Sequence, residues 1–331
     1  MRSANDARGR SAPLDTAFFM PEGIDNAVLI INPNAGRVRG FAPNQLDRAR
    51  LILQRDGIET DLAPTDGPGA AAEIARSAVA KGRQMVIACG GDGTFNEIVN
   101  GLAGSKVPLA LLPAGTANVL AKELALPWDI ERAAKLVAGS GLRRIALGLA
   151  ISADGTTRPR YFVSVAGAGP DGAIVHALNL GLKERAGILA YWAEGLRQLT
   201  AYTFPRLRVT AAGQVLDGTL VIVGRTKHYG GPFQITTEAD LHADEFELLV
   251  VSTSSRARYV SYLGFLWLGR LRSARHVTFL KATSVLCEPL DDAPVFTQVD
   301  GEPLGRLPVE FRIVPNALTL AVPTRPGRTP R

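Results

Sequence analysis

The chain has 331 residues, of which 46% are hydrophobic, and it carries a formal net charge of +6. This length allows two globular domains with separate cores. Its two cysteines, Cys89 and Cys287, lie far apart without a paired Cys/His spacing, which argues against structural zinc and indicates a reducing, cytoplasmic environment. No run reaches the roughly 18 to 20 apolar residues of a membrane-spanning helix. Residues 1–24 lack the apolar centre of a signal peptide, and we expect a disordered extension there.

Residues 25–147 alternate strand and helix patterns, which favours a parallel sheet. The expected strands and helices cover, in order, residues 27–31, 44–55, 58–62, 69–81, 84–89, 95–102 and 107–112. Every expected strand ends in small, polar or glycine residues, at the sheet edge where open α/β folds bind ligands. The pattern therefore predicts a Rossmann-like, three-layer α/β/α domain that binds a nucleotide.

The third strand leads into a glycine-rich turn, Gly90-Gly91-Asp92-Gly93-Thr94, followed by Glu97. Without Cβ atoms the backbone N–H groups can approach a polyphosphate, and the helix expected from Phe95 adds a partial positive charge. A carboxylate beside phosphates is repelled unless it handles a metal or a proton, so Asp92 indicates chemistry. The sequence contains neither a Gly-x4-Gly-Lys-Ser/Thr loop nor a Gly-x-Ser-x-Gly elbow, which argues against the commonest NTPases and hydrolases.

Residues 148–307 change to shorter β patterns, which predicts a second, mostly antiparallel β-sandwich domain. We expect strands at 161–165, 206–210, 219–223, 246–251 and 295–299, with helical insertions at 171–180 and 186–200. The runs 309–314 and 317–322, within residues 308–322, could extend this domain or return to the first. Residues 323–331 are expected to be disordered.

One basic and aromatic segment has a composition that is unusual for the surface of a globular protein. No Asp or Glu occurs from Leu248 to Cys287, and the apolar run 259–268 has arginines on both sides. This pattern is typical of a helix at an anionic lipid surface, and a buried helix with arginine ends is the alternative. No zinc finger, RNP-like pattern or basic helix is present, so we expect no nucleic-acid partner.

Three motifs resemble one known family from about Val28 to Val322. They are the runs 32–36 (Asn-Pro-Asn-Ala-Gly), 90–97 (Gly-Gly-Asp-Gly-Thr-Phe-Asn-Glu) and 112–118 (Leu-Pro-Ala-Gly-Thr-Ala-Asn). In this order and spacing they resemble the lipid kinases with a diacylglycerol-kinase-type catalytic domain, which include bacterial diacylglycerol kinases and eukaryotic sphingosine and ceramide kinases. The glycine turn alone also resembles NAD kinases and phosphofructokinases, so the first domain is expected to be NAD-kinase-like.

The resemblance implies an ATP site at the edge of the first sheet. Its expected residues are Asn32, Pro33, Asn34, Ala35, Gly36, Thr65, Gly90, Gly91, Asp92, Gly93, Thr94, Phe95, Asn96 and Thr116. Loop N–H groups and hydroxyls there are suitable donors to phosphate oxygens. Thr65 could instead be an ordinary turn residue, and Asn118 could merely cap a helix.

The second domain would supply the general base. Asp300-Gly301-Glu302 resembles the family's catalytic segment, in which the glutamate takes the proton of the lipid hydroxyl, and Asp92 would organise the metal and phosphates. A hydroxyl has a pKa far above 7, so a positioned carboxylate assists its attack. The alternative for Asp300-Gly301 is an ordinary β-turn.

The family also implies an acidic metal segment, here residues 239–247. By resemblance Asp244 is a Mg²⁺ ligand, joined by the backbone carbonyls of Leu241 and Phe246. Glu245 stands where the family commonly has glycine, which places this metal site in doubt. A solvated acidic loop is the alternative. Mg²⁺ is expected in any case as the partner of ATP.

We therefore expect an ATP-dependent lipid kinase that transfers the γ-phosphate of Mg·ATP to a lipid hydroxyl, on diacylglycerol or on a sphingoid or ceramide-like acceptor. Its partner would be a lipid at a membrane surface, with the protein cytoplasmic or peripheral at the inner face, and the interpretation leaves a homodimer open. A soluble NAD kinase-like phosphotransferase and a noncatalytic lipid-binding regulatory protein are the two alternatives.

Overall fold

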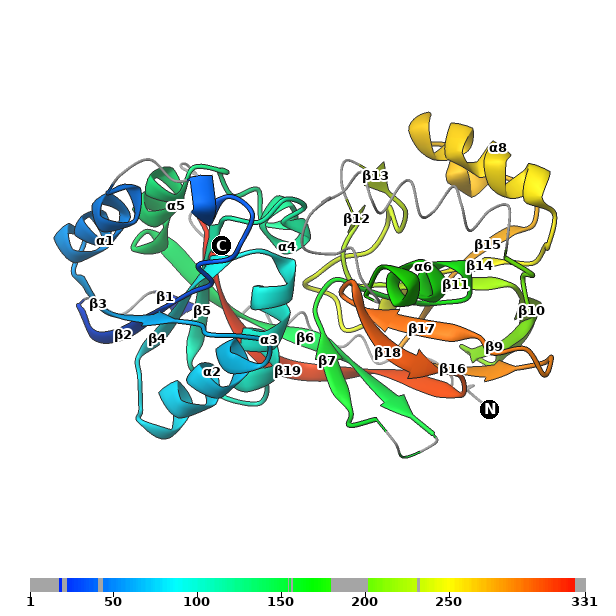
Figure 1. Ribbon diagram of the computed structural model, residues 1–331, viewed down its shortest axis with the longest axis horizontal. Helices are drawn as coiled ribbons and strands as arrows, with labels where there is room; N and C mark the ends of the chain where they lie inside the picture. Colours follow the sequence, from blue (N-terminus) through cyan, green and yellow to red (C-terminus); the bar gives the residue numbers. More distant parts are fainter. Residues whose placement is uncertain are drawn as a thin grey trace, which may run out of the picture.

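The computed structural model describes residues 18–19, 23–40, 44–153, 155, 157–179, 202–230 and 233–324. Within these ranges the chain forms two lobes side by side, with the first 140 residues in one lobe and most of the later strands in the other (Figure 1). The predicted helix 186–200 and the segments 1–17 and 325–331 lie outside the described residues.

The first lobe is built on four parallel strands in the order β5-β4-β2-β3. These are β2 (Ile24–Ile31), β3 (Ile58–Pro64), β4 (Met85–Gly90) and β5 (Pro108–Pro113). Their side chains alternate between two cores: Val28 and Ile30 pack with α2 (Ala70–Ala80) and α3 (Asp92–Leu102), whereas Leu29 and Ile31 pack with α1 (Gln45–Arg55) and α5 (Ile130–Val137). Both faces of the sheet are therefore covered, and the predicted three-layer α/β/α arrangement is confirmed.

Two long antiparallel strands join the lobes. β6 (Ser140–Ser152) and β19 (Val309–Pro323) pair over most of their length, and they run from one lobe into the other (Figure 1). β19 pairs in parallel with β5 at one end and antiparallel with β16 (Ser284–Pro289) at the other. The two runs expected at 309–314 and 317–322 are thus one strand, whose register against β6 shifts between Val314 and Leu318.

The second lobe is the predicted antiparallel β-sandwich. A six-stranded sheet in the order β15-β14-β11-β8-β17-β18 packs on the antiparallel end of the large sheet, where the order is β10-β9-β16-β19. One buried core contains Val223, Phe246 and Leu248 from the first of these sheets and Val209 and Phe311 from the second. The two sheets therefore face each other across one shared core.

The remaining elements complete these layers. They are β1 (Phe18–Phe19), η1 (Val38–Gly40), α4 (Val119–Glu123), β7 (Arg160–Phe162), β8 (Val165–Ala168), α6 (Pro170–Asn179), β9 (Leu207–Ala211), β10 (Gln214–Gly218), β11 (Leu220–Gly224), β12 (His228–Tyr229), β13 (Phe233–Gln234), β14 (Phe246–Val251), α8 (Arg256–Trp267), η2 (Leu271–Ser273), β15 (Val277–Ala282), β17 (Phe296–Val299) and β18 (Glu302–Arg306).

The sequence analysis did not predict α5, β6 or β16, and two further local features differ from its expectations. Phe18 and Phe19 form β1, which pairs with Gly141 and Leu142 of β6, within the segment expected to be disordered. Helix α3 begins at Asp92 rather than at Phe95, with Gly91 as its N-cap residue. The second difference matters for the site, because it places the Asp92 carboxylate in the first turn of the helix.

Candidate active site

The loops predicted to bind a nucleotide lie together at the carboxyl edge of the parallel sheet. The backbone N–H of Asn32 donates to the Cys89 carbonyl at 3.1 Å, and that of Ala114 donates to the Gly90 carbonyl at 2.8 Å. The ends of β2, β4 and β5 are thereby joined through their main chains. Asn32 also donates from Nδ2 to Thr94 Oγ1 at 3.2 Å. Two of the three sequence motifs thus contact each other through side chains as well.

Glycine is required where the second and third motifs touch. A Cβ atom on Gly115 would lie 2.4 Å from Gly91 Cα, and one on Gly36 would lie 3.3 Å from Thr116 Oγ1. Asn118 fixes this loop, because its Oδ1 accepts from Gly115 N at 3.0 Å and its Nδ2 donates to Gly115 O at 2.9 Å. Asn118 does precede α4, but its side chain makes no capping hydrogen bond to that helix. Here the glycines serve close backbone approach.

Thr65 and Glu97 lie near the carboxyl edge of the parallel sheet. Thr65 is largely buried directly after β3, and its N–H donates to the Ile31 carbonyl at 2.8 Å. Glu97 reaches from α3 to the start of α2, where Oε1 accepts from Gly69 N at 2.9 Å and Oε2 from Ala71 N at 3.2 Å. A carboxylate at a helix N-terminus satisfies donors that have no partner within the helix. Glu97 therefore caps α2 and is a structural residue of the edge.

Asp92 faces the junction of the two lobes. Its Oδ1 accepts a hydrogen bond from the backbone N–H of Val119 at 2.7 Å, which orients the carboxylate toward the start of α4. Burial raises the pKa of Asp92 to about 6, and the nearby Asp300 acts in the same direction. The Val119 hydrogen bond and the Lys122 ammonium oppose this shift. Asp92 is therefore a carboxylate held in an unfavourable environment, the condition that a cation relieves.

Glu302 enters the same junction from the second lobe. It follows a two-residue hairpin loop between β17 and β18, in which Asp300 has φ 46° and Gly301 has φ 78°. Positive φ at both central residues is typical of the type I′ hairpin, so Asp-Gly is also the turn that the alternative interpretation foresaw. A Cβ atom on Gly93 would lie 3.6 Å from Glu302 Oε1. The hairpin thus brings Glu302 against the first turn of α3.

Asp300 anchors the hairpin. Its Oδ2 accepts from Asn96 Nδ2 at 2.8 Å, and its two carboxylate oxygens accept from the backbone N–H groups of residues 163, 164 and 165 at 2.9 Å each. Burial raises the pKa of Asp300, and these hydrogen bonds oppose that shift. Asn96, predicted to contact ATP, is itself buried, and its side chain also bonds to Tyr161 and Arg160 of β7. The pair Asn96–Asp300 therefore connects the lobes.

A cavity of about 390 Å³ lies between Asp92 and Glu302. Among the residues predicted for the site it is lined by Asp92, Gly93, Phe95, Thr116 and Glu302, whereas the rest of the predicted ATP residues do not line it. Most of its remaining wall is apolar. This volume lies in the range of small-molecule sites. The further lining residues are Ala117, Val119, Leu120, Val163, Ser164, Val165, Val175, His228, Tyr229, Gly230, Gln298, Asp300 and Gly301.

The sequence analysis missed several polar residues around this cavity. Gln298, buried in β17, accepts from Gly301 N at 2.8 Å and donates to Asp171 Oδ2 at 2.7 Å, and Tyr229 also donates to Asp171. These contacts fix the hairpin that carries Glu302. None belongs to a local motif, because their residues meet only across the folded sandwich.

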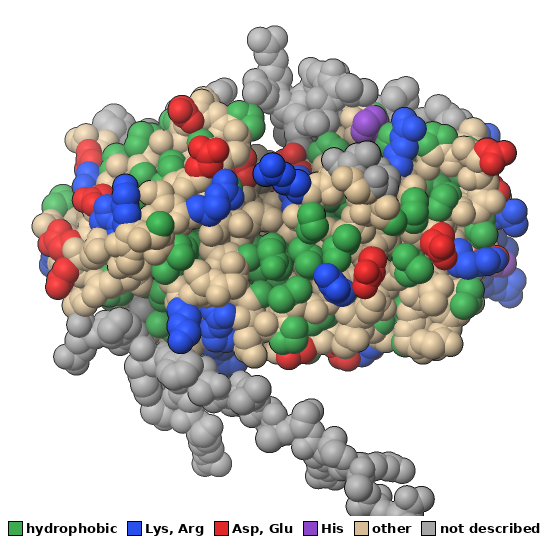
Figure 2. Space-filling model, turned by 90° about the horizontal axis from the view of Figure 1, so that it is seen from below, with side chains coloured by type: hydrophobic (Ala, Val, Ile, Leu, Met, Phe, Trp, Pro, Cys, Tyr) green, Lys and Arg blue, Asp and Glu red, His purple; other side chains and the backbone are tan. Residues whose placement is uncertain are grey.

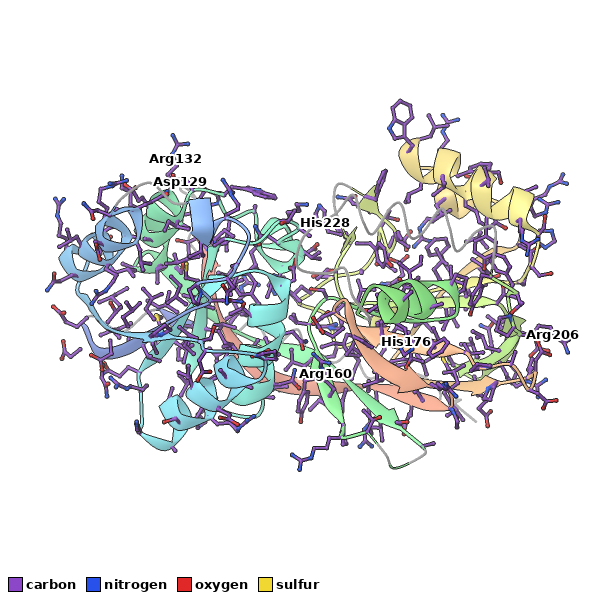
Figure 3. The ribbon with its side chains drawn as sticks, in the orientation of Figure 1. Asp129, Arg132, Arg160, His176, Arg206 and His228 are labelled. Carbon is purple, nitrogen blue, oxygen red and sulfur yellow. The ribbon has the colours of Figure 1, made fainter. Side chains whose placement is uncertain are left out.

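His228 and Arg160 mark two sides of the junction between the lobes (Figure 3). His228 Nδ1 lies 2.9 Å from Glu123 Oε2 of α4, so this contact also spans the lobes. Only the tertiary structure brings Glu123 and His228, which are 105 positions apart, into contact.

The predicted metal segment, residues 239–247, makes contacts of its own with other parts of the second lobe. The Asp244 side chain is exposed, and the Leu241 carbonyl accepts a hydrogen bond from Arg225 Nη2 at 2.8 Å. In the described ranges, no group of three or more His, Cys, Asp or Glu side chains is placed to hold a metal ion. Glu245 pairs with Lys281 at 2.6 Å. A divalent ion does not fit beside a buried guanidinium, and we assign no chemical step to this segment.

Comparison with known proteins agrees with the fold and with the three motifs. Residues 26–150 match the family described as Diacylglycerol kinase catalytic domain, and residues 164–322 match the YegS C-terminal NAD kinase beta sandwich-like domain. A diacylglycerol kinase of Bacillus subtilis (strain 168) is 28% identical over 290 residues, 86% of this chain and 92% of that protein. A diacylglycerol kinase of Staphylococcus carnosus (strain TM300) is 28% identical over 289 residues, with 86% and 91% coverage.

Solved structures show the same architecture. A crystal structure of a diacylglycerol kinase from Bacillus anthracis str. Sterne has a TM-score of 0.67 at 22% identity, covering 91% of this chain and 97% of that one. A second structure from the same strain reaches 0.74 at 22% identity, with 91% and 95% coverage.

Fold, site and relatives together define an enzyme, and its class is that of the lipid kinases. The chain belongs to the family with the diacylglycerol kinase catalytic domain followed by the NAD kinase-like β-sandwich domain. The predicted family resemblance is thus confirmed. Of the two alternatives, neither the NAD kinase-like enzyme nor the noncatalytic protein is favoured by this assignment.

Proposed function

We propose that this enzyme transfers the γ-phosphate of Mg·ATP to the hydroxyl of a lipid that carries no negative charge, with diacylglycerol or a sphingoid or ceramide-like alcohol as the acceptor. The observation that carries the proposal is the meeting of Asp92 and Glu302 in one cavity, although they come from different lobes. A nucleotide along the edge of the parallel sheet would present its γ-phosphate to the N-terminus of α3, where the backbone favours anions.

The two carboxylates would have separate roles. Glu302 would accept the proton of the lipid hydroxyl while the oxygen of that hydroxyl bonds to the γ-phosphorus. The bond from the γ-phosphorus to the β,γ-bridging oxygen breaks in the same step, which releases ADP. Asp92 would hold the Mg²⁺ that arrives with ATP and so fix the geometry of the phosphates. The pKa of Asp92, raised to about 6 by burial, supports this role, because an adjacent divalent ion stabilises the ionised carboxylate.

The composition of the cavity supports an acceptor without a negative charge. Its charged residues, among those the structure describes, are the acids Asp92, Asp300 and Glu302, and no Lys or Arg lines it. An acceptor with its own phosphate, such as phosphatidylglycerol, would meet like charges in a partly desolvated site. The apolar wall, with Leu120, Val163 and other aliphatic side chains, suits the hydrocarbon part of a lipid.

The test is transfer of label from γ-labelled ATP with Mg²⁺ into organic-extractable product. Mixed micelles would offer diacylglycerol, ceramide, a sphingoid base or phosphatidylglycerol separately, with NAD as a soluble control. We expect label in one of the lipids without a phosphate group, and we expect Asp92→Ala and Glu302→Gln to abolish it. Glu73→Gln, on the exposed face of α2, is the matched control and should keep full activity. Label in NAD alone, or normal turnover in either cavity variant, would refute the corresponding assignment.

We further propose that α8 docks the enzyme on an anionic bilayer, which places it as a peripheral protein at the inner face of the membrane. Tyr259 and Tyr262 attach the helix to the second lobe through buried rings, while Val260, Leu263 and Trp267 are exposed by 54%, 42% and 78%. Helical spacing sets these two groups on different faces. The exposed apolar face suits the headgroup boundary of a lipid layer.

Charge favours a lipid surface over an apolar partner. α8 lies on the upper side of the second lobe, beside β13 (Figure 1), within a stretch that contains six Arg or Lys residues and no acid. By contrast, basic and acidic side chains are interspersed on the face in Figure 2. No described helix is long and apolar enough to cross a membrane. Anionic lipids attract such basic segments electrostatically.

Vesicle co-sedimentation tests this docking. The enzyme should bind vesicles that contain phosphatidylglycerol more tightly than vesicles of phosphatidylcholine alone. Trp267→Ala should weaken binding roughly 30-fold, equivalent to about 2 kcal/mol for burial of one large apolar side chain. Trp128→Ala is the matched control, because Trp128 is also exposed, by 41%, but lies in the first lobe. Equal binding of all three proteins would exclude α8 as the docking element.

A further inference from the structure

Arg225 is the largest fully buried side chain of the described chain, and its partners are all carbonyl oxygens. Nη2 donates to Leu241 O at 2.8 Å and to Ala146 O at 3.0 Å. Nη1 donates to Glu245 O at 2.8 Å and to Ala243 O at 2.5 Å. Four backbone oxygens, three from the loop 241–245 and one from β6, therefore converge on a single positive group.

Such a convergence is costly unless a cation occupies it. Backbone carbonyls that point toward one another repel, and a buried guanidinium without partners loses its hydration, so each group stabilises the other. An arginine guanidinium stays protonated in proteins at neutral pH. The loop and the guanidinium together form a filled cation site.

The geometry points to a substitution of one cation by another. We propose that Arg225 is a resident organic cation that replaces the divalent ion implied by the family for the segment around Asp244, so this loop binds no metal. Leu241 O, an expected metal ligand, is already engaged, and a divalent ion near the guanidinium would meet a like charge in a poorly solvated region. The exposed Asp244 carboxylate then acts only through its charge.

This arrangement also explains the residue at 245. Glycine there would suit a tight metal-binding turn, but the side chain of Glu245 extends to β15, where it pairs with Lys281 at 2.6 Å. Only the carbonyl of Glu245 contributes to the Arg225 cluster. The departure from the family at this position is therefore compatible with the arginine-filled loop.

The cluster lies behind the wall of the active-site cavity. The backbone N–H of Arg225 donates to the Ser164 carbonyl at 2.8 Å, and Ser164 N donates to Asp300 Oδ1 at 2.9 Å. Ala146, the fourth carbonyl, belongs to β6, which both lobes share. We infer that Arg225 holds the loop 241–245 against β6 and thereby supports the strand connection that carries Asp300.

The test compares metal binding and thermal unfolding without nucleotide, so that no Mg·ATP is involved. The wild-type protein should have the same Tm in EDTA as in excess Mg²⁺, and Mn²⁺ titration followed by electron paramagnetic resonance should give the same bound fraction for wild type and Asp244→Asn. A Tm that falls on chelation, or bound Mn²⁺ that Asp244→Asn removes, would overturn the proposal. This part of the test needs no variant of Arg225.

Two variants probe the oxygen cluster itself. Arg225→Asn removes the charge and the end of the side chain, so the exposed carbonyls should now accept a divalent ion, and Mg²⁺ should raise the Tm of this variant. Arg225→Lys keeps a cation in place and should show no such response. If a folded Arg225→Asn protein is as indifferent to Mg²⁺ and Mn²⁺ as the lysine variant, the loop is not a cation site and the proposal fails.

Discussion

Replacing Asp92 by asparagine should make the stability of this enzyme less dependent on pH. Burial raises the pKa of Asp92 from 3.8 to about 6, so the folded protein holds this proton more tightly than the unfolded chain does. As the pH rises from about 4 to about 6, ionisation at Asp92 therefore lowers the free energy of unfolding of the wild type. A shift of about two pKa units corresponds to at most ~3 kcal/mol.

The amide introduced by Asp92→Asn cannot ionise, and its oxygen can still accept from Val119 N. The difference in unfolding free energy between Asp92→Asn and the wild type should thus grow in favour of the variant between pH 4 and pH 6 and stay constant above about pH 7. Urea denaturation across this pH range measures it. Asp47→Asn, on the exposed face of α1, controls for the loss of one surface carboxylate. A pH-independent difference, or one of opposite sign, would refute the environment derived for Asp92.

Three further outcomes follow from the contacts of the site. Gly115→Ala should lower the free energy of unfolding by ~1–3 kcal/mol and abolish nucleotide binding, because the added Cβ would lie 2.4 Å from Gly91 Cα. ATP titration calorimetry measures the binding, and normal binding would show that the two loops can separate. Glu97→Ala should lower the free energy of unfolding by about 1 kcal/mol, measured by urea denaturation, and should keep turnover near the wild-type level, because Glu97 caps α2. Loss of turnover in a stable variant would show that Glu97 is a catalytic residue instead. Asn96→Ala should lower the free energy of unfolding by about 2 kcal/mol, because it removes the hydrogen-bond donor to Asp300. An unchanged midpoint of urea denaturation would mean that this link between the lobes is dispensable.

The local and periodic parts of the molecule could be predicted from the sequence. β14 spans the predicted residues 246–251, and the strands of the first lobe lie within a few residues of their predicted positions, because short apolar runs bounded by turn residues are typical of strands that are buried on both faces. Asp92 and Glu302 were identified because each stands in a motif with an unusual acid. The start of α3 was placed too late, since glycines at 91 and 93 conceal a helix N-terminus that tertiary contacts stabilise.

Contacts between distant segments could not be predicted in this way. Arg225 carries no local motif, and its burial depends on four carbonyls from two other segments. The same holds for Gln298 and for the pair Glu123–His228. Periodicity tells which side of a strand is buried, but it gives no information about which strand faces it.

β19 has a consequence for how the protein is made. Its residues 319 and 320 pair with β5. One edge of β5 therefore stays unpaired during synthesis until β19 has left the ribosome. An unpaired strand edge is a site of wrong pairing during synthesis. Although the first 120 residues contain every nucleotide motif, we expect a fragment that ends before β19 to be prone to aggregation, and a chaperone that shields β5 would suit this order of assembly.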